Sequence, residues 1–244
     1  MKYIELLGLP GSGKTSLLRS FRRQGIAGQA GTTVLSEDLS MALRRFGYRD
    51  VGFSRGPRSR GFGILRADVL RNHFHDGWQM GIFAEYPELF SQVFLCLKTV
   101  RPEDRQRAIL LNYWRSRTSL YFDVNCSTSP SYCLVDEGLS QSVFSTMSRM
   151  STRLDQKLKL VESVLRCLPS ERTVVMLQTP SELIELRAQS RKKSSPKDLS
   201  RRIAELDFIF QQQKKIGRDT IELDGSLSID ELCTELGAFI NKAG

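Results

Sequence analysis

The residues best suited to chemistry form one glycine-rich segment near the amino end, Gly8-Leu9-Pro10-Gly11-Ser12-Gly13-Lys14-Thr15. The segment matches the pattern GxxxxGK[ST] in full, and the glycines of such a loop let backbone N–H groups curl around phosphate oxygens. We expect Lys14 to be an exposed side chain that reaches the β- and γ-phosphates of ATP, and the Thr15 hydroxyl to bind Mg²⁺. The segment therefore predicts a phosphate-binding loop with the following cofactor-binding residues: Gly8, Pro10, Gly11, Ser12, Gly13, Lys14, Thr15 and Ser16.

Two acidic residues, Asp136 and Glu137, directly follow a short apolar run at 132–135 (YCLV). A carboxylate at the end of a neighbouring strand supplies the second half of a site of this kind. We predict that Asp136 is a catalytic residue that binds Mg²⁺ or its water, and that Glu137 positions a water or the acceptor. Acidic residues also end strands for solubility, so the prediction for Asp136 depends on its pairing with the glycine-rich loop.

Positive charge is concentrated in three segments of this 244-residue chain, whose formal net charge is +9. They are 44–71 with eight arginines, 101–117 with five arginines, and 187–202 with seven lysines and arginines. Such clusters suit phosphate-bearing ligands or nucleic acid, although each one alone is also compatible with a solvated helix face.

Within the third basic segment, Arg187 and Arg191 are four residues apart and project from one face of a helix. A cation that arrives with a closing lid stabilises the charge that develops on the γ-phosphate oxygens while water is excluded. We predict that both arginines are catalytic residues of a lid at about 186–200. The alternative is a basic helix end that complements its own dipole.

Short apolar runs alternate with helical patterns along the chain, which favours a parallel sheet with helices on both faces. The predicted strands are Tyr3–Leu7, Gly31–Ser36, 132–135, Thr173–Leu177 and Thr220–Leu223. The predicted helices include Lys14–Arg23, a core helix at Tyr86–Leu97, one long amphipathic helix from Val143 to Leu165, and Lys197–Ile216. We therefore expect an α/β fold, a three-layer P-loop NTPase sandwich, as a single domain over 1–244 with a helical acceptor-side insertion at about 40–130.

Two helix starts carry capping signals. Thr179 is the predicted N-cap of a helix in which Pro180 occupies the first turn and Glu182 completes a capping box. Ser228 and Glu231 predict a capping box at the start of the last helix.

Composition disfavours several classes of protein. Hydrophobic residues make up 40% and charged residues 26% of the chain, which is typical of a globular protein with a buried core. Because the sequence has neither a long uncharged run nor a signal peptide, we expect a cytoplasmic protein without a membrane partner. The five cysteines include no CxxC pair, and His73 and His75 are the only histidines, which disfavours a disulfide framework or a zinc site. A homodimer is compatible with these features.

Taken in chain order, four segments resemble the nucleoside and nucleotide kinase superfamily, particularly thymidylate-kinase-like P-loop kinases. They are the loop at Gly8–Thr15, the strand end Asp136-Glu137-Gly138, the basic lid at Arg187–Lys193 and the closing pattern Ile221–Ser226. The resemblance implies a five-stranded sheet of order 2-3-1-4-5 and places Gly225 in a loop that lies against the adenine. It also implies an acidic catalytic residue after the second strand that activates the acceptor hydroxyl, and Glu37 is the candidate, with Asp38 beside it. The alternative is a helix-opening acidic pair that complements the dipole.

One feature departs from this resemblance, because Glu137 follows Asp136 where such kinases usually carry an arginine. The departure disfavours thymidylate itself as the substrate. If the acceptor carries a phosphate, the arginines that we consider as replacements are Arg44, Arg45, Arg66, Arg71, Arg101, Arg105 and Arg115.

Three functions fit these observations. The leading hypothesis is a kinase that needs ATP and Mg²⁺ and transfers the γ-phosphate to a hydroxyl or phosphate of a nucleotide, nucleoside or sugar. A second hypothesis keeps this machinery but acts on a nucleic-acid hydroxyl or modified base, with the arginines and aromatic residues of 44–71 as a strand-binding surface. The third is an ATP-binding regulatory NTPase without a phosphate acceptor.

Overall fold

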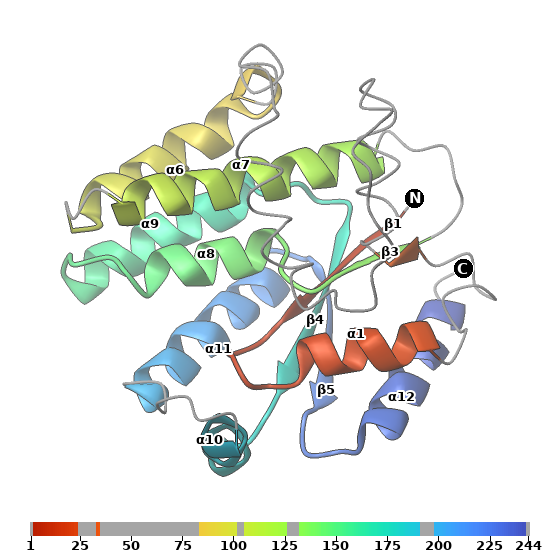
Figure 1. The fold of residues 1–244 in the computed structure, drawn as a ribbon. Helices are drawn as coiled ribbons and strands as arrows, with labels where there is room; N and C mark the ends of the chain where they lie inside the picture. The colour runs from red at the N-terminus through yellow and green to blue at the C-terminus, as the bar shows by residue number, and fades with distance from the viewer. Residues whose placement is uncertain are drawn as a thin grey trace, which may run out of the picture.

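The centre of the fold is a parallel sheet (Figure 1), and the computed structural model describes residues 2–23, 33–34, 83–101, 105–125, 132–190 and 198–242. The strands are β1 (Lys2–Leu7), β2 (Thr33–Val34), β3 (Tyr132–Val135), β4 (Arg172–Gln178) and β5 (Asp219–Asp224). Their order in the sheet is β2-β3-β1-β4-β5. The four longer strands form the body of the sheet, and the two-residue β2 pairs with β3 at one edge. The predicted α/β fold with parallel strands is confirmed.

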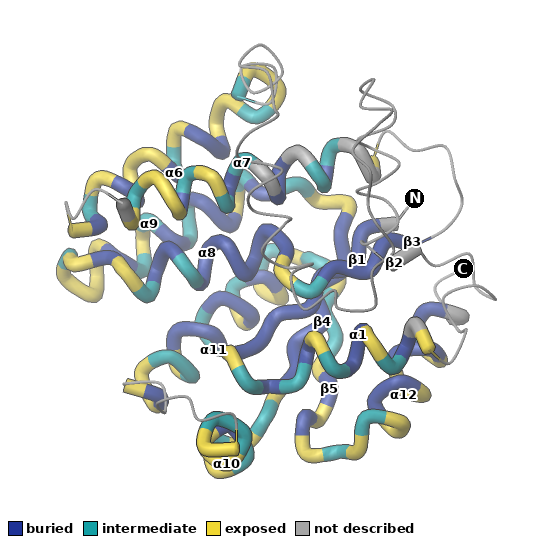
Figure 2. Tube along the Cα trace, in the orientation of Figure 1, coloured by how far each residue is buried: buried dark blue, intermediate teal, exposed yellow. Residues whose placement is uncertain are grey.

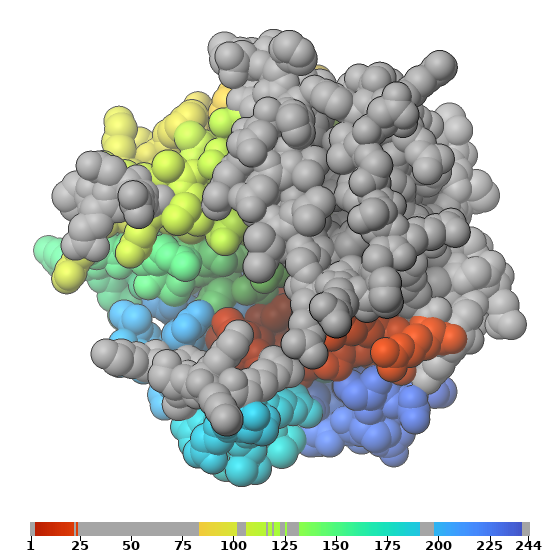
Figure 3. All heavy atoms as spheres, in the orientation of Figure 1, coloured from red at the N-terminus to blue at the C-terminus, as the bar shows by residue number. Residues whose placement is uncertain are grey.

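Helices cover both faces of the sheet (Figure 1). One face carries α1 (Lys14–Arg23) and α12 (Ile229–Lys242), which lie side by side at the surface in Figure 3. The other face carries α6 (Pro87–Thr99), α7 (Arg105–Asn125), α8 (Leu139–Met147), α9 (Leu154–Cys167) and α11 (Leu199–Lys215). A further helix, α10 (Ser181–Ser190), follows β4 at the edge of this second layer.

The strand sequences explain why two cores form. Side chains alternate along a strand, so Val174 and Met176 of β4 enter the core beneath α8 and α11, whereas Val175 and Leu177 enter the core beneath α1 and α12. All four are buried, and the central strands are dark along most of their length in Figure 2. A near-continuous apolar strand is what a sheet covered on both faces requires.

The predicted long helix from Val143 to Leu165 is wrong, because the chain forms α8 and α9 with a break between them. At the break Met150 pairs with Val100 in an antiparallel bridge. The Ser151 N–H and hydroxyl donate to the Thr99 carbonyl at 3.0 and 2.8 Å. These bonds to the end of α6 replace the helical ones. The apolar spacing continues across the break because both helices face the same core.

The two capping predictions have different outcomes. At the start of α12, the Ser228 N–H donates to the Glu231 carboxylate at 2.8 Å and the Glu231 N–H to the Ser228 hydroxyl at 3.3 Å, so this capping box is confirmed. The N-cap prediction for Thr179 is wrong, because its hydroxyl donates to the Ser12 carbonyl at 3.1 Å. Since α10 begins at Ser181, the phosphate-binding loop and not the helix takes this hydroxyl.

Several predicted residues lie outside the described part of the chain. Of the insertion at about 40–130, the structure describes α6, α7 and their immediate surroundings, and of the lid at about 186–200 it describes 186–190 and 198–200. None of the helices that the structure describes is both long enough and apolar enough to cross a membrane. The residues outside the description include Glu37, Asp38, Arg191, His73, His75 and the whole basic segment 44–71.

Candidate active site

The loop between β1 and α1 has a backbone that only glycine adopts readily. Gly11 and Gly13 have φ angles of +96° and +107°, where a side chain would be strained. The Ser12 N–H donates to the Leu9 carbonyl at 3.1 Å, and α1 begins at Lys14, so the loop turns directly into a helix. The first N–H groups of α1 lack intrahelical partners by geometry, an arrangement that favours a bound anion.

Lys14 lies at the centre of this loop and is only 8% exposed, so the predicted exposed lysine is wrong. Its ammonium donates to the carbonyls of Gly8 at 2.6 Å and Leu9 at 3.2 Å, because the loop wraps around the side chain. Burial lowers the pKa of Lys14, while the charges of Asp136 and Glu137 act in the opposite direction. The lysine is therefore a positioned cation at the mouth of α1.

The predicted magnesium residues come together at the ends of β1 and β3. These strands are parallel neighbours, so the loop after β1 and the acidic residues after β3 meet at one edge of the sheet. The Thr15 hydroxyl donates to Asp136 Oδ2 at 2.6 Å. Oδ1 of Asp136 is buried and has no hydrogen-bond partner among the described residues. A hydroxyl beside a carboxylate with an unused oxygen is a donor set that fits Mg²⁺, which prefers oxygen ligands.

Gly138 ends the acidic turn because a buried carboxylate lies directly beneath it. A Cβ at this position would be 1.9 Å from Glu5 Oε2. Glu5 accepts the Ser140 N–H at 3.1 Å as well as the Ser140 hydroxyl, and it pairs with the buried Arg172. Arg172 in turn donates to Gln213 of α11 at 2.5 Å. This network anchors the start of α8, and with it the turn that carries Asp136 and Glu137.

A residue that we did not predict, Arg117 of α7, contacts the acidic turn after β3. It donates to the Glu137 carboxylate and, at 2.9 Å, to the Ser142 hydroxyl. Its guanidinium carbon lies 4.7 Å from the centre of the Tyr113 ring. The Arg117 side chain is 9% exposed, whereas that of Glu137 is 58% exposed. Spacing alone does not single out Arg117, because α7 contains several arginines and only the fold shows which one faces β3.

Arg187 of α10 lies against the opposite side of the loop. Its guanidinium donates to the carbonyls of Ser12 at 2.8 Å, Gly11 at 3.4 Å and Gly225 at 3.5 Å. The Gly225 N–H donates to the Gln178 carbonyl at 2.5 Å, so the closing loop after β5 is joined to the end of β4. The structure therefore brings Arg187 and Gly225 to the phosphate-binding loop.

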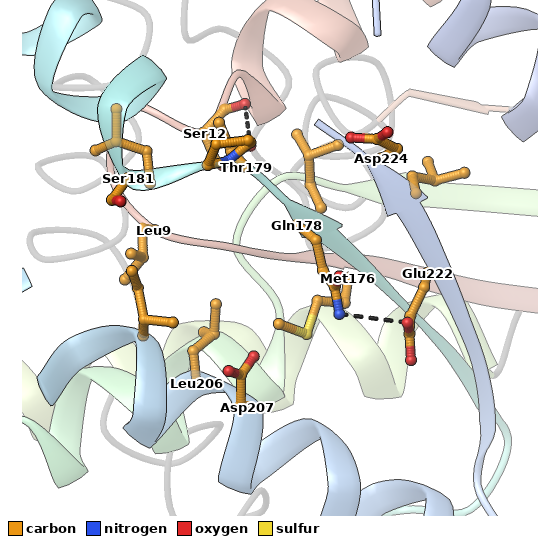
Figure 4. Close-up of a pocket in the computed structure, with 15 residues that line it drawn as sticks. Leu9, Ser12, Met176, Gln178, Thr179, Ser181, Leu206, Asp207, Glu222 and Asp224 are labelled. Carbon is orange, nitrogen blue, oxygen red and sulfur yellow. Dashed lines mark hydrogen bonds between the residues drawn. The ribbon is translucent and has the colours of Figure 1, made fainter. Parts of the chain in front are cut away.

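A cavity of about 640 Å³ separates α10 and α11 from the ends of β4 and β5 (Figure 4). Its apolar wall includes Met176, Ile184 and Leu206, and its polar wall includes Asp207 and Glu222. Burial and the charge of Glu222 raise the pKa of Asp207. The carboxylates of Asp207 and Glu222 make this part of the cavity unfavourable for a phosphate group.

Two solved structures are similar to this fold over nearly its whole length. Thymidylate kinase from Candida albicans has 12% sequence identity and a TM-score of 0.50, covering 99% of this chain and 92% of that chain. A deoxyadenosine kinase from M. mycoides with bound dATP has 13% identity and a TM-score of 0.48, covering 98% of this chain and 99% of that chain. No family model and no curated protein matches the sequence. The chain therefore shares its fold with this thymidylate kinase.

Proposed function

We propose that this protein is a kinase that uses ATP and Mg²⁺ and transfers the γ-phosphate to a small acceptor of nucleotide type. One observation carries the proposal: Lys14 lies at the mouth of α1, and Thr15 beside it donates to Asp136 at 2.6 Å. Phosphoryl transfer needs positioning and positive charge more than covalent chemistry, and this site supplies both. The similarity in fold to thymidylate kinase is consistent with this function.

The residues of the loop have separate tasks in this proposal. The N–H groups of Gly13–Thr15 would hold the β-phosphate, since they lie at the start of α1 and lack intrahelical partners. Lys14 would exchange its two carbonyl contacts for phosphate oxygens, because its ammonium is already at the loop. Thr15 and Asp136 would hold Mg²⁺, which when bound neutralises charge on the phosphate oxygens.

The acceptor binds on the side of Glu137 in this proposal. An attacking hydroxyl forms a bond to the γ-phosphorus as the bond to the β,γ-bridging oxygen breaks, ADP leaves, and the hydroxyl proton passes to a carboxylate or to water. Glu137 is more than half exposed and adjacent to Asp136, so it can orient this hydroxyl. The catalytic roles predicted for Glu37, Arg187 and Arg191 remain predictions, as do the homodimer and the cytoplasmic location.

The proposal is tested with labelled ATP, Mg²⁺ and separate pools of nucleosides, nucleoside monophosphates, sugars and oligonucleotides. We expect label to move to the nucleoside or nucleotide pool in the wild-type protein, and to remain in ATP with Lys14→Ala. Transfer to oligonucleotides alone would support the nucleic-acid hypothesis. ATP hydrolysis that no pool accelerates would refute the kinase assignment and favour a regulatory NTPase.

A further inference from the structure

The side chain of Arg117 is held in place by contacts that do not involve its carboxylate partner. The Ser142 hydroxyl accepts one N–H at 2.9 Å, and Tyr113 lies beneath the guanidinium plane. Both contacts come from helices that pack in the core, α8 and α7 itself. The guanidinium therefore keeps its position when the partner of its remaining N–H groups changes.

The two members of the Arg117–Glu137 pair differ in burial, which decides which of them can leave. Arg117 is 9% exposed and Glu137 is 58% exposed. Solvating a carboxylate that is already half in water costs little, whereas an unpaired arginine in this position would be a buried charge without a counter-ion. An incoming anion can therefore replace Glu137 at Arg117.

Arg117 is also close enough to act on the phosphate site. Its partner Glu137 is the next residue after Asp136, which the Thr15 hydroxyl contacts at 2.6 Å. Arg117 therefore contacts the residue next to the predicted magnesium ligand, a position from which a guanidinium can reach a bound phosphate.

We infer that Arg117 binds a phosphoryl group when the site is occupied, and that Glu137 neutralises its charge when the site is empty. The inference rests on the proposed function. In the kinases that the sequence resembles, an arginine usually stands directly after the acidic residue. In this chain Glu137 stands there, and Arg117 of α7 would take over the role of that arginine. The phosphoryl group belongs either to ATP or to a phosphate on the acceptor, since guanidinium recognises both through the same oxygens.

The test is equilibrium binding to the full-length protein without turnover, measured by calorimetry with pyrophosphate, ATP, nucleoside monophosphates and nucleosides as separate ligands. Arg117→Ala should weaken binding of the phosphate-bearing ligand by about 10-fold to 100-fold, the effect of one charge-assisted hydrogen-bonded contact. Nucleoside binding should stay unchanged. If Arg117→Ala weakens binding of ATP and pyrophosphate, Arg117 contacts the phosphate donor. If it weakens only the binding of nucleoside monophosphates, Arg117 contacts the phosphate acceptor.

Glu137→Gln provides a change of opposite sign. Without the competing carboxylate, Arg117 should bind the same phosphate-bearing ligand more tightly than in the wild-type protein. Arg166→Ala is the matched control, because Arg166 forms an exposed ion pair with Glu162 on α9, and it should leave all affinities unchanged. If Arg117→Ala fails to fold, Arg117→Lys combined with Glu137→Gln still tests the opposing effects.

Unchanged affinity for every phosphate-bearing ligand in a folded Arg117→Ala protein would overturn the inference. Equal weakening by Arg117→Ala and Glu137→Gln, or weakening that includes nucleosides, would show a structural role and would also overturn it. Failure of the proposed function is distinguishable. A protein that transfers no phosphate but shows the opposing shifts in affinity refutes the proposed kinase function and supports the inference on Arg117. A protein that transfers phosphate but shows unchanged affinities supports the kinase function and refutes the inference.

Discussion

Arg117 and Arg187 flank the same phosphate-binding loop, yet their surroundings differ in kind. Arg117 contacts residues that follow β3, whereas Arg187 follows β4, and these strands lie on opposite sides of β1. Arg117 pairs with a carboxylate that a phosphate can replace. Arg187 donates to the backbone carbonyls of Gly11 and Ser12 in the glycine-rich loop and of Gly225 in the loop after β5. The two arginines therefore differ in their partners, a side-chain carboxylate for Arg117 and backbone carbonyls for Arg187.

Lys14 follows β1, the strand between β3 and β4, and its removal should have the largest effect on transfer. We expect Lys14→Ala to lower the rate of phosphate transfer by at least about 10³-fold, since a positioned cation at the developing charge is lost. Transfer of labelled phosphate measures the rate, and a melting curve establishes that the variant is folded. Wild-type turnover in the variant would show that Lys14 has no role in transfer. The loop would then not be the active site, and the comparison of Arg117 with Arg187 would lose its purpose.

Substitutions at Asp136 and Thr15, on the same side of the loop as Arg117, should change how the transfer rate depends on Mg²⁺. Asp136→Asn keeps the size of the side chain but removes its charge, so we expect transfer to fall by about 10²-fold to 10³-fold. Thr15→Ala should have a smaller effect, about 10-fold to 100-fold, by analogy with residues that orient a metal site. The measurement is the transfer rate as a function of Mg²⁺ concentration. An unchanged magnesium dependence in both variants would contradict the assignment of the metal.

Substitution of Arg187 should instead lower the affinity for ATP. Arg187→Ala removes contacts to three loop carbonyls, so we expect ATP to bind about 10-fold to 100-fold more weakly, with a smaller change in kcat. Steady-state kinetics at varied ATP concentration separate the two quantities. A kcat that falls far more than the affinity for ATP would support the predicted transition-state role of Arg187. Arg187 and Arg117 would then both act on a phosphoryl group.

Gly138→Ala tests whether the turn that presents Asp136 and Glu137 depends on the carboxylate beneath it. Because the new Cβ would lie 1.9 Å from Glu5 Oε2, we expect the free energy of unfolding to fall by about 1–3 kcal/mol. We also expect the Arg117–Glu137 pair to be displaced, which denaturant unfolding combined with pyrophosphate binding would detect. A variant of wild-type stability would show that the turn relaxes without cost.

Ser228→Ala should have the smallest effect and serves as the reference for a change in stability alone. It removes the hydroxyl that accepts the Glu231 N–H at the start of α12. We expect a loss of about 1 kcal/mol in the free energy of unfolding. Because this cap makes no contact with Arg117, Arg187 or Lys14 among the described hydrogen bonds, transfer and ATP affinity should be unchanged. Altered kinetics would show that loss of stability by itself affects the site.

Local signals predicted well the elements whose residues determine their own conformation. The glycines at positions 11 and 13 require positive φ angles, and the Ser228–Glu231 capping box is satisfied within one turn of chain. Prediction failed where distant atoms compete for the same groups. The Thr179 hydroxyl donates to the Ser12 carbonyl instead of capping α10. The break between α8 and α9 is stabilised by hydrogen bonds to the Thr99 carbonyl. Neither partner can be inferred from nearby sequence.

The sequence alone determined the alternation of strands and helices, the glycine-rich turn before α1 and the acidic strand end, because each depends on residues adjacent in the chain. Only the tertiary structure decided that Lys14 is buried, that Glu5 and Arg172 support Gly138, and that Arg117 is the arginine beside Glu137. Arg117 and Glu137 are 20 positions apart, and their contact exists because α7 packs beside β1 and α8. Spacing in a sequence specifies faces of helices, whereas pairs between elements depend on how those faces pack.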